Sequence, residues 1–314
     1  MKLGSNDISS VYLGSNAVSK VYLGSTEVWS SYTPLLDVYT GAAAAYSLRL
    51  LRTAYTGSAI RVRRASDNTE QNIGFVNNEL DTTSLASFCS GTNGYVTTWY
   101  DQSGNGYNAT QTTAASQPQI VSSGSVITEN GKPTVQFDGS NDTLINSVGF
   151  LNNVADVYSS AVFSTTSTTT NQIVHSNPSD TLGTRGYDLR LPNSTQIQIS
   201  IRTNPSNTST NAVGNFNYST GNYNLITGTF NASLSTNEQK IYGNASLVAE
   251  ISNSGDSIQN GGASGGMLIG YFSTPTSFGA FLSGNVGELI FYTTDQSSNR
   301  TGIETNINSF YSIY

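Results

Sequence analysis

Short stretches in which apolar and polar residues alternate, separated by turns rich in Gly, Ser and Asn, make up most of this chain. Such alternation is typical of half-buried β-strands. The pattern predicts strands at residues 59–63, 95–100, 134–137, 161–164, 196–201, 223–230, 239–242, 267–270 and 286–292. Strands of this number and length are typical of an all-β sandwich of two packed antiparallel sheets.

Three segments interrupt the strand pattern and predict short helices. Residues 42–52 combine an alanine run with Leu and Arg, which have high helix propensity, and Gly57 follows as a stop. Asp81 is placed to cap a second helix that runs to Cys89. Residues 297–314 return to helical spacing and predict a helix at the C-terminal end.

The first 30 residues contain an internal repeat, because Leu-Gly-Ser recurs at residues 3–5, 13–15 and 23–25, a spacing of ten. Each unit joins a short β-prone piece to a turn in which Gly accepts a positive φ. We therefore expect strand, turn and strand in each unit. The linker Ser-Ser-Tyr-Thr-Pro at residues 30–34 marks a boundary, which predicts a ribbon at residues 1–32 and a separate domain at 33–314.

A ribbon of this size buries too little surface to be stable alone in water, so it needs a partner. One alternative is that it packs on its own downstream domain. The other is that it pairs with copies of itself, for example as a trimer, or docks on another protein, since regular repeats suit a symmetric assembly. In the second case the anchoring side chains are Leu3, Tyr12, Leu13, Tyr22, Leu23 and Trp29.

Charge and composition exclude several function classes. The net charge of −7 makes nucleic acid a poor partner. The chain begins without an apolar signal-peptide region and has no run of 18 apolar residues, so we expect neither a signal peptide nor a membrane span. With one Cys and one His the chain lacks a zinc-ligand set, and we expect no metal and no cofactor.

Candidate catalytic and ligand-binding groups are few. His175 has no triad motif around it, which favours a structural or surface histidine. Residues 138–142 (Asp-Gly-Ser-Asn-Asp) offer oxygen ligands for Ca²⁺, but without EF-hand spacing they favour a turn closed by Asp side chains. Arg61 and Arg63 share one face of a strand and either grip an anionic partner or, as we expect, form local salt bridges with neighbouring acids such as Glu70.

Aromatic side chains near predicted loops are candidates for stacking against sugar rings, as in other jelly-roll carbohydrate sites. We single out Trp99, Tyr100, Tyr107 and Tyr187. Trp99 and Tyr100 are adjacent on a strand and face opposite ways, so at least one of them belongs to the core.

Four motifs carry a family resemblance: Tyr-Ser-Leu-Arg at residues 46–49, Val-Arg-Arg-Ala-Ser-Asp at 62–67, Phe-Cys-Ser-Gly at 88–91 and Tyr-Asp-Gln-Ser-Gly-Asn-Gly at 100–106. In order and spacing they resemble the N-terminal half of the catalytic domain of the α-L-arabinofuranosidase B family. Later blocks at residues 137–142, 239–244 and 287–292 are similar to concanavalin A-like, laminin-G-like jelly rolls in general. The resemblance implies a two-sheet antiparallel jelly roll.

The resemblance also implies retaining hydrolysis, which needs two carboxyl groups about 5 Å apart. The family's nucleophile lies in an Asp-Leu-Glu segment and its acid in a Gly-Gly-Asp-Asn segment. The regions taken to correspond, residues 196–204 and 270–273, contain no acid, and Cys89 lacks the partner expected at Asn93 or Gly94. We therefore expect no glycosidase activity.

Together these features predict a non-enzymatic bacteriophage virion protein, because its organisation is similar to that of virion proteins in which a small N-terminal module anchors an exposed jelly roll. It would be a homo-oligomeric tail fibre, spike or capsid-decorating protein that contacts other virion proteins and displays a domain able to bind a host-surface glycan. The alternatives are a secreted arabinofuranosidase-like hydrolase, with Asp188 or Glu288 as test carboxylates, and a free carbohydrate-binding module.

Overall fold

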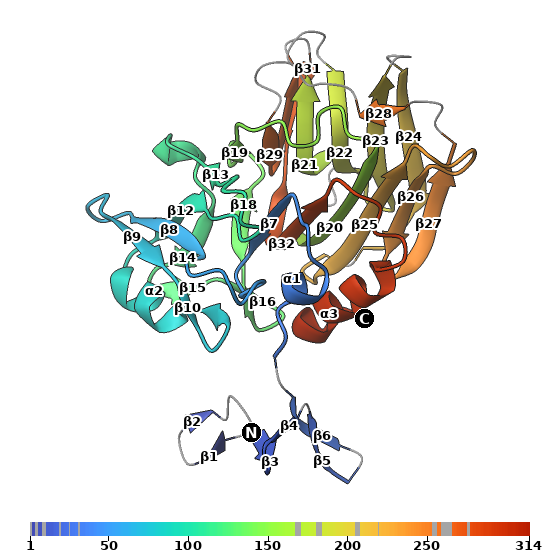
Figure 1. The fold of residues 1–314 in the computed structure, drawn as a ribbon. Coiled ribbons are helices and arrows are strands. Elements are labelled where there is room, and N and C mark those ends of the chain that lie inside the picture. Colours follow the sequence, from blue (N-terminus) through green and yellow to red (C-terminus); the bar gives the residue numbers. More distant parts are fainter. Residues whose placement is uncertain are drawn as a thin grey trace.

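A computed structural model describes the fold of this chain (Figure 1). It describes residues 2–3, 6–7, 11–18, 20–24, 26–30, 32–166, 171–179, 184–204, 208–218, 220–252, 256–258, 266–274 and 277–314. The protein is an all-β antiparallel jelly roll with a few short helices, as the strand pattern predicted. No helix in these ranges is long and apolar enough to cross a membrane.

The sandwich consists of two layers of hydrogen-bonded antiparallel strands. The first layer runs, in spatial order, through β9 (Glu70–Ile73), β8 (Ile60–Arg64), β12 (Gly94–Trp99), β14 (Gln119–Ser122), β18 (Val135–Asp138), β32 (Ser283–Tyr292), β20 (Asp156–Thr165), β25 (Asn224–Asn231), β26 (Gln239–Gly243) and β27 (Ser246–Ile251). The second runs through β13 (Ala109–Thr110), β19 (Leu144–Asn146), β29 (Met267–Ile269), β21 (Gln172–Ser179), β22 (Thr184–Asn193), β23 (Gln196–Asn204) and β24 (Thr208–Asn215). β13 pairs with both β12 and β19 and so joins the two layers.

Other short strands pair with strands of these layers or form separate two-stranded sheets beside them. They are β7 (Ala44–Ser47), β10 (Phe75–Val76), β11 (Glu79–Leu80), β15 (Ser125–Val126), β16 (Thr128–Glu129), β17 (Lys132–Pro133), β28 (Ser257–Ile258), β30 (Tyr271–Thr274) and β31 (Ser277–Phe281). The helices are α1 (Leu35–Val38), α2 (Thr82–Phe88), α3 (Arg300–Tyr311) and a 3₁₀ turn at Ala114–Ser116.

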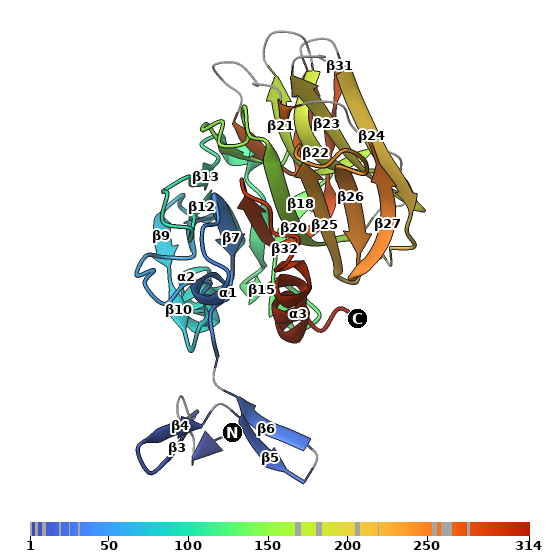
Figure 2. The ribbon, with the colours of Figure 1, turned by 45° about the vertical axis from the view of Figure 1, so that its right-hand side comes forward.

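The N-terminal repeats form three two-stranded hairpins, which the figures place below the sandwich (Figures 1 and 2). They pair β1 (Lys2–Leu3) with β2 (Asn6–Asp7), β3 (Val11–Leu13) with β4 (Asn16–Val18), and β5 (Lys20–Leu23) with β6 (Thr26–Ser30). Gly14 and Gly24 have φ of 64° and 63°, the positive value that the repeat's turns require. The predicted strand–turn–strand unit is therefore correct.

The apolar side chains predicted to anchor the ribbon are exposed where the structure describes them. Tyr12 is 64% exposed, Leu13 78% and Leu23 76%. The side chains of Leu3, Tyr22 and Trp29 lie outside the described part of the chain. Because the three described side chains have no cover in the single chain, they are available to a partner.

Two of the three expected helices are present, and the third is a strand. Asp81 caps α2 by accepting a hydrogen bond from the backbone N–H of Ser84 at 2.9 Å, and α3 ends the chain as predicted. Within the expected helix 42–52, however, Ala44–Ser47 forms β7. It pairs with β32 and is buried along its whole length, so tertiary pairing overrides the helix propensity of the alanine run.

Two apolar clusters hold the sandwich together. The larger lies between the layers, where the Tyr187 hydroxyl of the second layer contacts the Ser159 hydroxyl of the first at 2.6 Å. The smaller lies on the outer face of the first layer, where Ile303 and Ile307 of α3 pack with Ile290 of β32 and Leu35 of α1. The helices therefore cover only one part of that outer face (Figure 2).

His175 lies inside the larger cluster and is fully buried. Its ring stacks on Tyr187 at 5.6 Å and meets Phe291 edge-on at 5.0 Å, and neither ring nitrogen has a hydrogen-bond partner in the described structure. Burial alone lowers the pKa of His175 to about 3. The residue is a structural core histidine, one of the two roles expected.

This burial predicts an acid-sensitive fold. In the unfolded chain His175 takes up a proton below its ordinary pKa of about 6.5, whereas the folded chain does not until about pH 3. Stability is therefore lost as the pH falls from 6.5 towards 3, at up to about 1.4 kcal/mol per unit. In His175→Phe, the difference in unfolding free energy between pH 7 and pH 4.5, measured by urea denaturation, should shrink by about 2.5 kcal/mol. An unchanged difference would contradict this account.

Candidate functional site

The loop after β12 is built by two buried polar side chains. The Asp101 carboxylate accepts hydrogen bonds from the backbone N–H groups of Ala45 (2.8 Å), Ser103 (2.9 Å) and Tyr107 (3.0 Å). The Gln102 side chain accepts from the N–H of Leu51 at 2.8 Å and donates to two carbonyl groups of the β7 segment. The Asp-Gln pair of the family-like motif therefore positions backbone.

A pocket of about 510 Å³ opens between this loop and the segment that precedes β7. Tyr107 and Phe150 line it as a parallel stacked pair, with ring centroids 5.7 Å apart and an interplanar angle of 11°. The polar groups of the wall come from Arg52, Asn105, Thr40, Ser103 and Thr293. The rest of the wall is formed by Leu36, Gly41, Ala42 and Ala43. We call this the Tyr107 pocket.

Local bonds hold the polar wall of the Tyr107 pocket in place. Arg52 donates from Nη1 to the carbonyl of Ser103 at 2.9 Å, and Asn105 donates from Nδ2 to the carbonyls of Ala42 and Ala43. A Cβ at Gly104 would lie 2.4 Å from Arg52 Nη1, and φ there is +100°, so glycine is required. Within the described part of the chain, the Asn105 side-chain oxygen and Nε and Nη2 of Arg52 make no hydrogen bond.

The four aromatic residues predicted to contact a sugar lie in different environments. Trp99 and Tyr187 are fully buried in the core and present no face to a ligand, so the prediction is wrong for these two. Both residues lie on strands in which successive side chains alternate between the two faces, and both side chains point into the core between the layers. Tyr100 is half-buried and donates to Asn72 at 2.9 Å, away from the Tyr107 pocket. Tyr107 alone among the four lines this pocket.

Sequence reasoning did not single out Phe150, Arg52 or Asn105 as pocket residues. Arg52 was assigned to the expected helix that is absent, and Phe150 lies between two strands without a motif. Gly104 and Asn105, inside the family-like motif, were the one available signal of a conformationally special loop.

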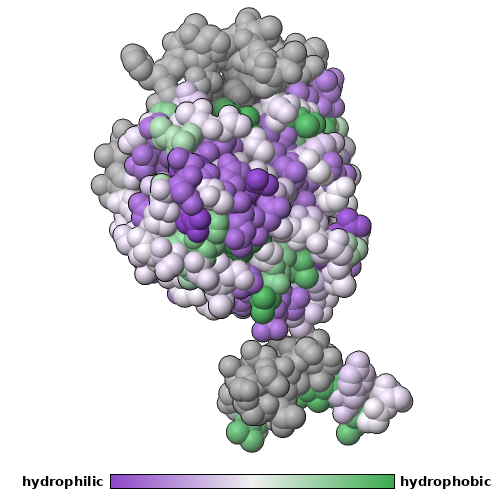
Figure 3. All heavy atoms as spheres, turned by 90° about the vertical axis from the view of Figure 1, so that its left-hand side faces the viewer, coloured by the Kyte–Doolittle hydropathy of each residue, from purple (hydrophilic) through white to green (hydrophobic). Residues whose placement is uncertain are grey.

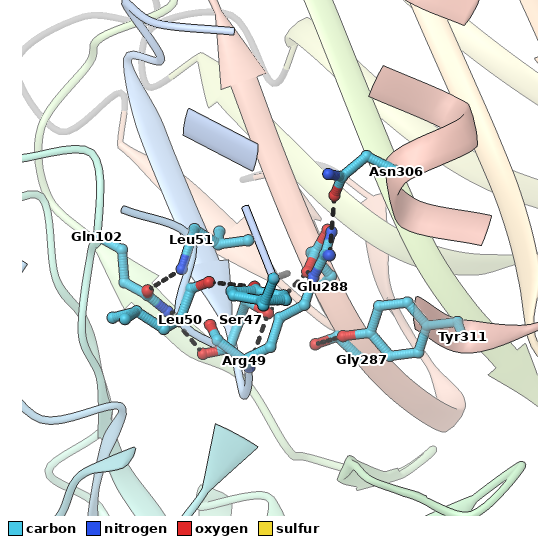
Figure 4. Close-up of polar contacts among 10 residues, drawn as sticks. Ser47, Arg49, Leu50, Leu51, Gln102, Gly287, Glu288, Asn306 and Tyr311 are labelled. Carbon is cyan, nitrogen blue, oxygen red and sulfur yellow. Dashed lines mark hydrogen bonds and ion pairs between the residues drawn. The ribbon is translucent and has the colours of Figure 1, made fainter. Parts of the chain in front are cut away.

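Glu288, one of the two carboxylates named for a hydrolase, belongs to a buried ion pair. Arg49 Nε lies 2.8 Å from Glu288 Oε2 and Nη2 lies 2.9 Å from Oε1, and both side chains are 1% exposed (Figure 4). Ser47 donates to the same carboxylate, and Arg49 Nη1 donates to Asn306 of α3. Burial opposes the charged guanidinium, but the Glu288 carboxylate outweighs it and raises the pKa of Arg49.

Asp188, the other named carboxylate, is also buried. It is 0% exposed on β22, and its Oδ1 lies 3.7 Å from Nε of Arg190. A nucleophile or a general acid must reach substrate. Glu288 is 1% exposed, and neither Asp188 nor Glu288 lines the Tyr107 pocket or the cavity bordered by Arg63 and Gln136.

The remaining local predictions can be placed directly. Arg61 forms the expected salt bridge with Glu70 at 2.5 Å, whereas Arg63 instead binds Gln117 and Asn68. The 138–142 segment is a turn in which Asp138 accepts from the N–H groups of residues 140 and 141, as expected. Among the described residues no group of three or more His, Cys, Asp or Glu side chains could hold a metal ion.

Comparison with known proteins identifies the scaffold. Residues 36–177 match the sequence family described as α-L-arabinofuranosidase B, catalytic, which is less than half of the chain. No curated protein sequence matches this chain.

Three solved structures share the fold over 89% of this chain. They are a Glu-to-Gln mutant of GH54 α-L-arabinofuranosidase soaked with 4-nitrophenyl α-L-arabinofuranoside (19% identity, TM-score 0.63), GH54 α-L-arabinofuranosidase soaked with a cyclic sulfate inhibitor (18%, 0.60), and an arabinofuranosidase complexed with arabinofuranosyl-α-1,2-xylobiose (18%, 0.58). This chain spans 65–66% of the length of those chains. The likeness establishes the resemblance to that catalytic domain at the level of fold.

The buried ion pair gives a test of its structural role. Removing one partner leaves an uncompensated buried charge, so Arg49→Met and Glu288→Leu should each lower the free energy of unfolding by about 3–5 kcal/mol. The double variant should recover much of that loss, because both charges are gone. Urea denaturation of the four proteins measures this cycle.

Arg61→Met, which breaks the exposed pair with Glu70, is the matched control and should change stability far less. Additive losses in the double variant at residues 49 and 288 would show that the two side chains do not act as a pair.

Proposed function

We propose that this chain is a non-enzymatic carbohydrate-binding jelly roll, displayed on the surface of a bacteriophage particle by its N-terminal hairpins. The Tyr107 pocket carries the proposal. Its stacked aromatic pair, its amide oxygen, its guanidinium donors and its hydroxyl groups are the usual means of holding a sugar. None of the residues described as lining it is an Asp or a Glu.

The display role rests on the hairpins. Tyr12, Leu13 and Leu23 keep more than half of their surface exposed, although apolar side chains are normally covered. Hairpins of two strands are marginal on their own, and a regular ten-residue repeat suits a symmetric, homo-oligomeric or virion-bound assembly. In this proposal other virion proteins are the partner of residues 1–32, and a host-surface glycan is the partner of the sandwich.

An arabinofuranosidase-like hydrolase is the second candidate. The family match over residues 36–177 and the TM-scores of 0.58–0.63 favour it. The burial of Asp188 and Glu288 beside arginines opposes the two carboxylates that were named for it.

Tyr107→Ala tests the binding site. The variant keeps the backbone bonds of residue 107, whose N–H donates to Asp101 and whose carbonyl accepts from Tyr46 and Asn146, and removes only the ring. On an array of arabinose-, galactose- and mannose-containing glycans, the affinity for whichever glycan binds should fall about tenfold, the factor for 1.4 kcal/mol. Tyr100→Ala, which removes a half-buried tyrosine outside the pocket, is the matched control.

The hydrolase alternative is decided with the same preparations. We expect no release of 4-nitrophenol from 4-nitrophenyl α-L-arabinofuranoside at high protein concentration. Steady turnover would overturn the non-enzymatic proposal.

Deleting residues 1–32 tests display. The truncated protein should keep the thermal transition of the sandwich and its glycan binding but be missing from purified particles, as measured by mass spectrometry. Normal loading of the truncated protein would contradict an anchoring role. A full-length protein that remains monomeric and never co-purifies with particles would favour a free carbohydrate-binding module.

A further inference from the structure

The outer face of the first layer carries a continuous row of polar side chains. Strand register places one residue from each of six adjacent strands side by side across β9, β8, β12, β14, β18 and β32. These residues are Glu70, Arg63, Tyr95, Gln119, Gln136 and Asn285. Their sequence neighbours, such as Val62, Val96 and Val135, point the other way into the core.

The middle of this row borders a second cavity. The lining of this space of about 460 Å³ includes Arg63, Tyr95, Gln119 and Gln136 of the row, Gln117, and two carboxyl groups, those of Asp138 at the end of β18 and Asp142 in the turn after it. Its size lies within the range of small-molecule sites, about 300–1,000 Å³. Figure 3 looks onto the side that carries β8 and β9 and shows hydrophilic side chains gathered at its centre. We call this cavity the Gln136 pocket.

Arg63, the positively charged residue in the lining of the Gln136 pocket, is hydrogen-bonded within the protein. Arg63 donates to Gln117 (2.7 Å), to Asn68 (2.9 Å) and to the carbonyl of Ala114 (3.3 Å), and its guanidinium lies 4.9 Å from the ring centroid of Tyr95. Each guanidinium nitrogen therefore already has a protein acceptor, although two of the five N–H donors stay available. The carboxyl groups of Asp138 and Asp142 in the same lining disfavour an anionic ligand. A metal ion would find two carboxyl groups here, and among the described residues no three His, Cys, Asp or Glu side chains come together as a metal site.

The neutral polar groups are the ones left open. Within the described structure the Gln136 amide makes no hydrogen bond, and Gln119 uses only its Nε2, which donates to Val121. Asp138 accepts backbone bonds through Oδ1, and Asp142 accepts one through Oδ2, from the N–H of Asp138 at 3.0 Å. The Gln136 amide, Oε1 of Gln119 and one oxygen each of Asp138 and Asp142 are thus available to a ligand.

Asp142 has an environment that suits a neutral ligand. It is 7% exposed, and burial, followed by the nearby Asp138 carboxylate, raises its pKa to about 7. Near neutral pH the carboxyl group is therefore about half protonated and can both donate and accept. Each sugar hydroxyl both donates and accepts hydrogen bonds, as do a partly protonated carboxyl group and the amides beside it.

We propose that the Gln136 pocket is a second carbohydrate site, which holds one neutral sugar residue through Gln136, Gln119 and Asp142. This site deepens the proposed glycan-binding function, and it is separate from the Tyr107 pocket because the two share no lining residue. A chain with two sugar sites would hold a branched or extended glycan by avidity, so weak individual sites would suffice.

The test uses the full-length chain and three neutral probes, methyl α-L-arabinofuranoside, methyl β-D-galactopyranoside and methyl α-D-mannopyranoside, each titrated by calorimetry. For at least one probe, Gln136→Ala and Asp142→Asn should each weaken binding about fivefold or more, the effect of losing about one hydrogen bond. Binding at this site should persist in Tyr107→Ala. Asp142→Asn is isosteric, so it tests the site even if Gln136→Ala folds poorly.

Gln71→Ala removes an exposed glutamine on β9 outside the pocket and is the matched control. The proposal is overturned if no probe binds the wild type, or if both pocket variants bind all probes as the wild type does. It is also overturned if CaCl₂ alone binds and Asp142→Asn abolishes that binding, because the pocket is then a cation site. If Tyr107→Ala loses all binding while Gln136→Ala binds as the wild type does, the second site is ruled out and the proposed function stands.

Discussion

The buried pair of Arg49 and Glu288 is the constraint on which the arrangement of this molecule depends. It joins the segment after β7 to β32 and, through Asn306, to α3. Both of these elements lie more than 200 residues after Arg49 in the sequence. Two charges taken out of water are tolerated only when nearly every donor and acceptor is satisfied, so the positions of these elements are closely specified. Gln102, which binds the backbone on both sides of Arg49, extends the same constraint to the loop that forms the Tyr107 pocket.

The residues that make this chain resemble an arabinofuranosidase are mostly framework residues. Arg49 and Asp101, both within family-like motifs, hold backbone and buried charge, and Glu288 of the later block pairs with Arg49. A sequence match carried by such residues reports a shared scaffold, and chemistry depends on side chains placed at a site on it. Two pockets on this scaffold are lined by aromatic and amide side chains, together with Ser and Thr hydroxyl groups in the Tyr107 pocket and two carboxyl groups in the Gln136 pocket.

The same outer sheet face serves two purposes. Where α1 and α3 cover it, its outward side chains are apolar or paired, as with Ile290 and Glu288. Where no helix covers it, its outward side chains form the polar row that borders the Gln136 pocket. The helices therefore decide which part of this sheet face is apolar and covered and which part stays polar and open.

Local signals in the sequence determined most of the strands, the hairpin turns with Gly14 and Gly24, the cap at Asp81 and the Asp138 turn. Each of these depends on residues close together in the chain. Only the tertiary structure decided that residues 44–47 form a strand, because β32 supplies the hydrogen bonds that outweigh helix propensity. It also decided that Trp99 and Tyr187 are core and that Phe150 meets Tyr107, because alternation assigns a side chain to one face of a strand while long-range packing determines what covers that face.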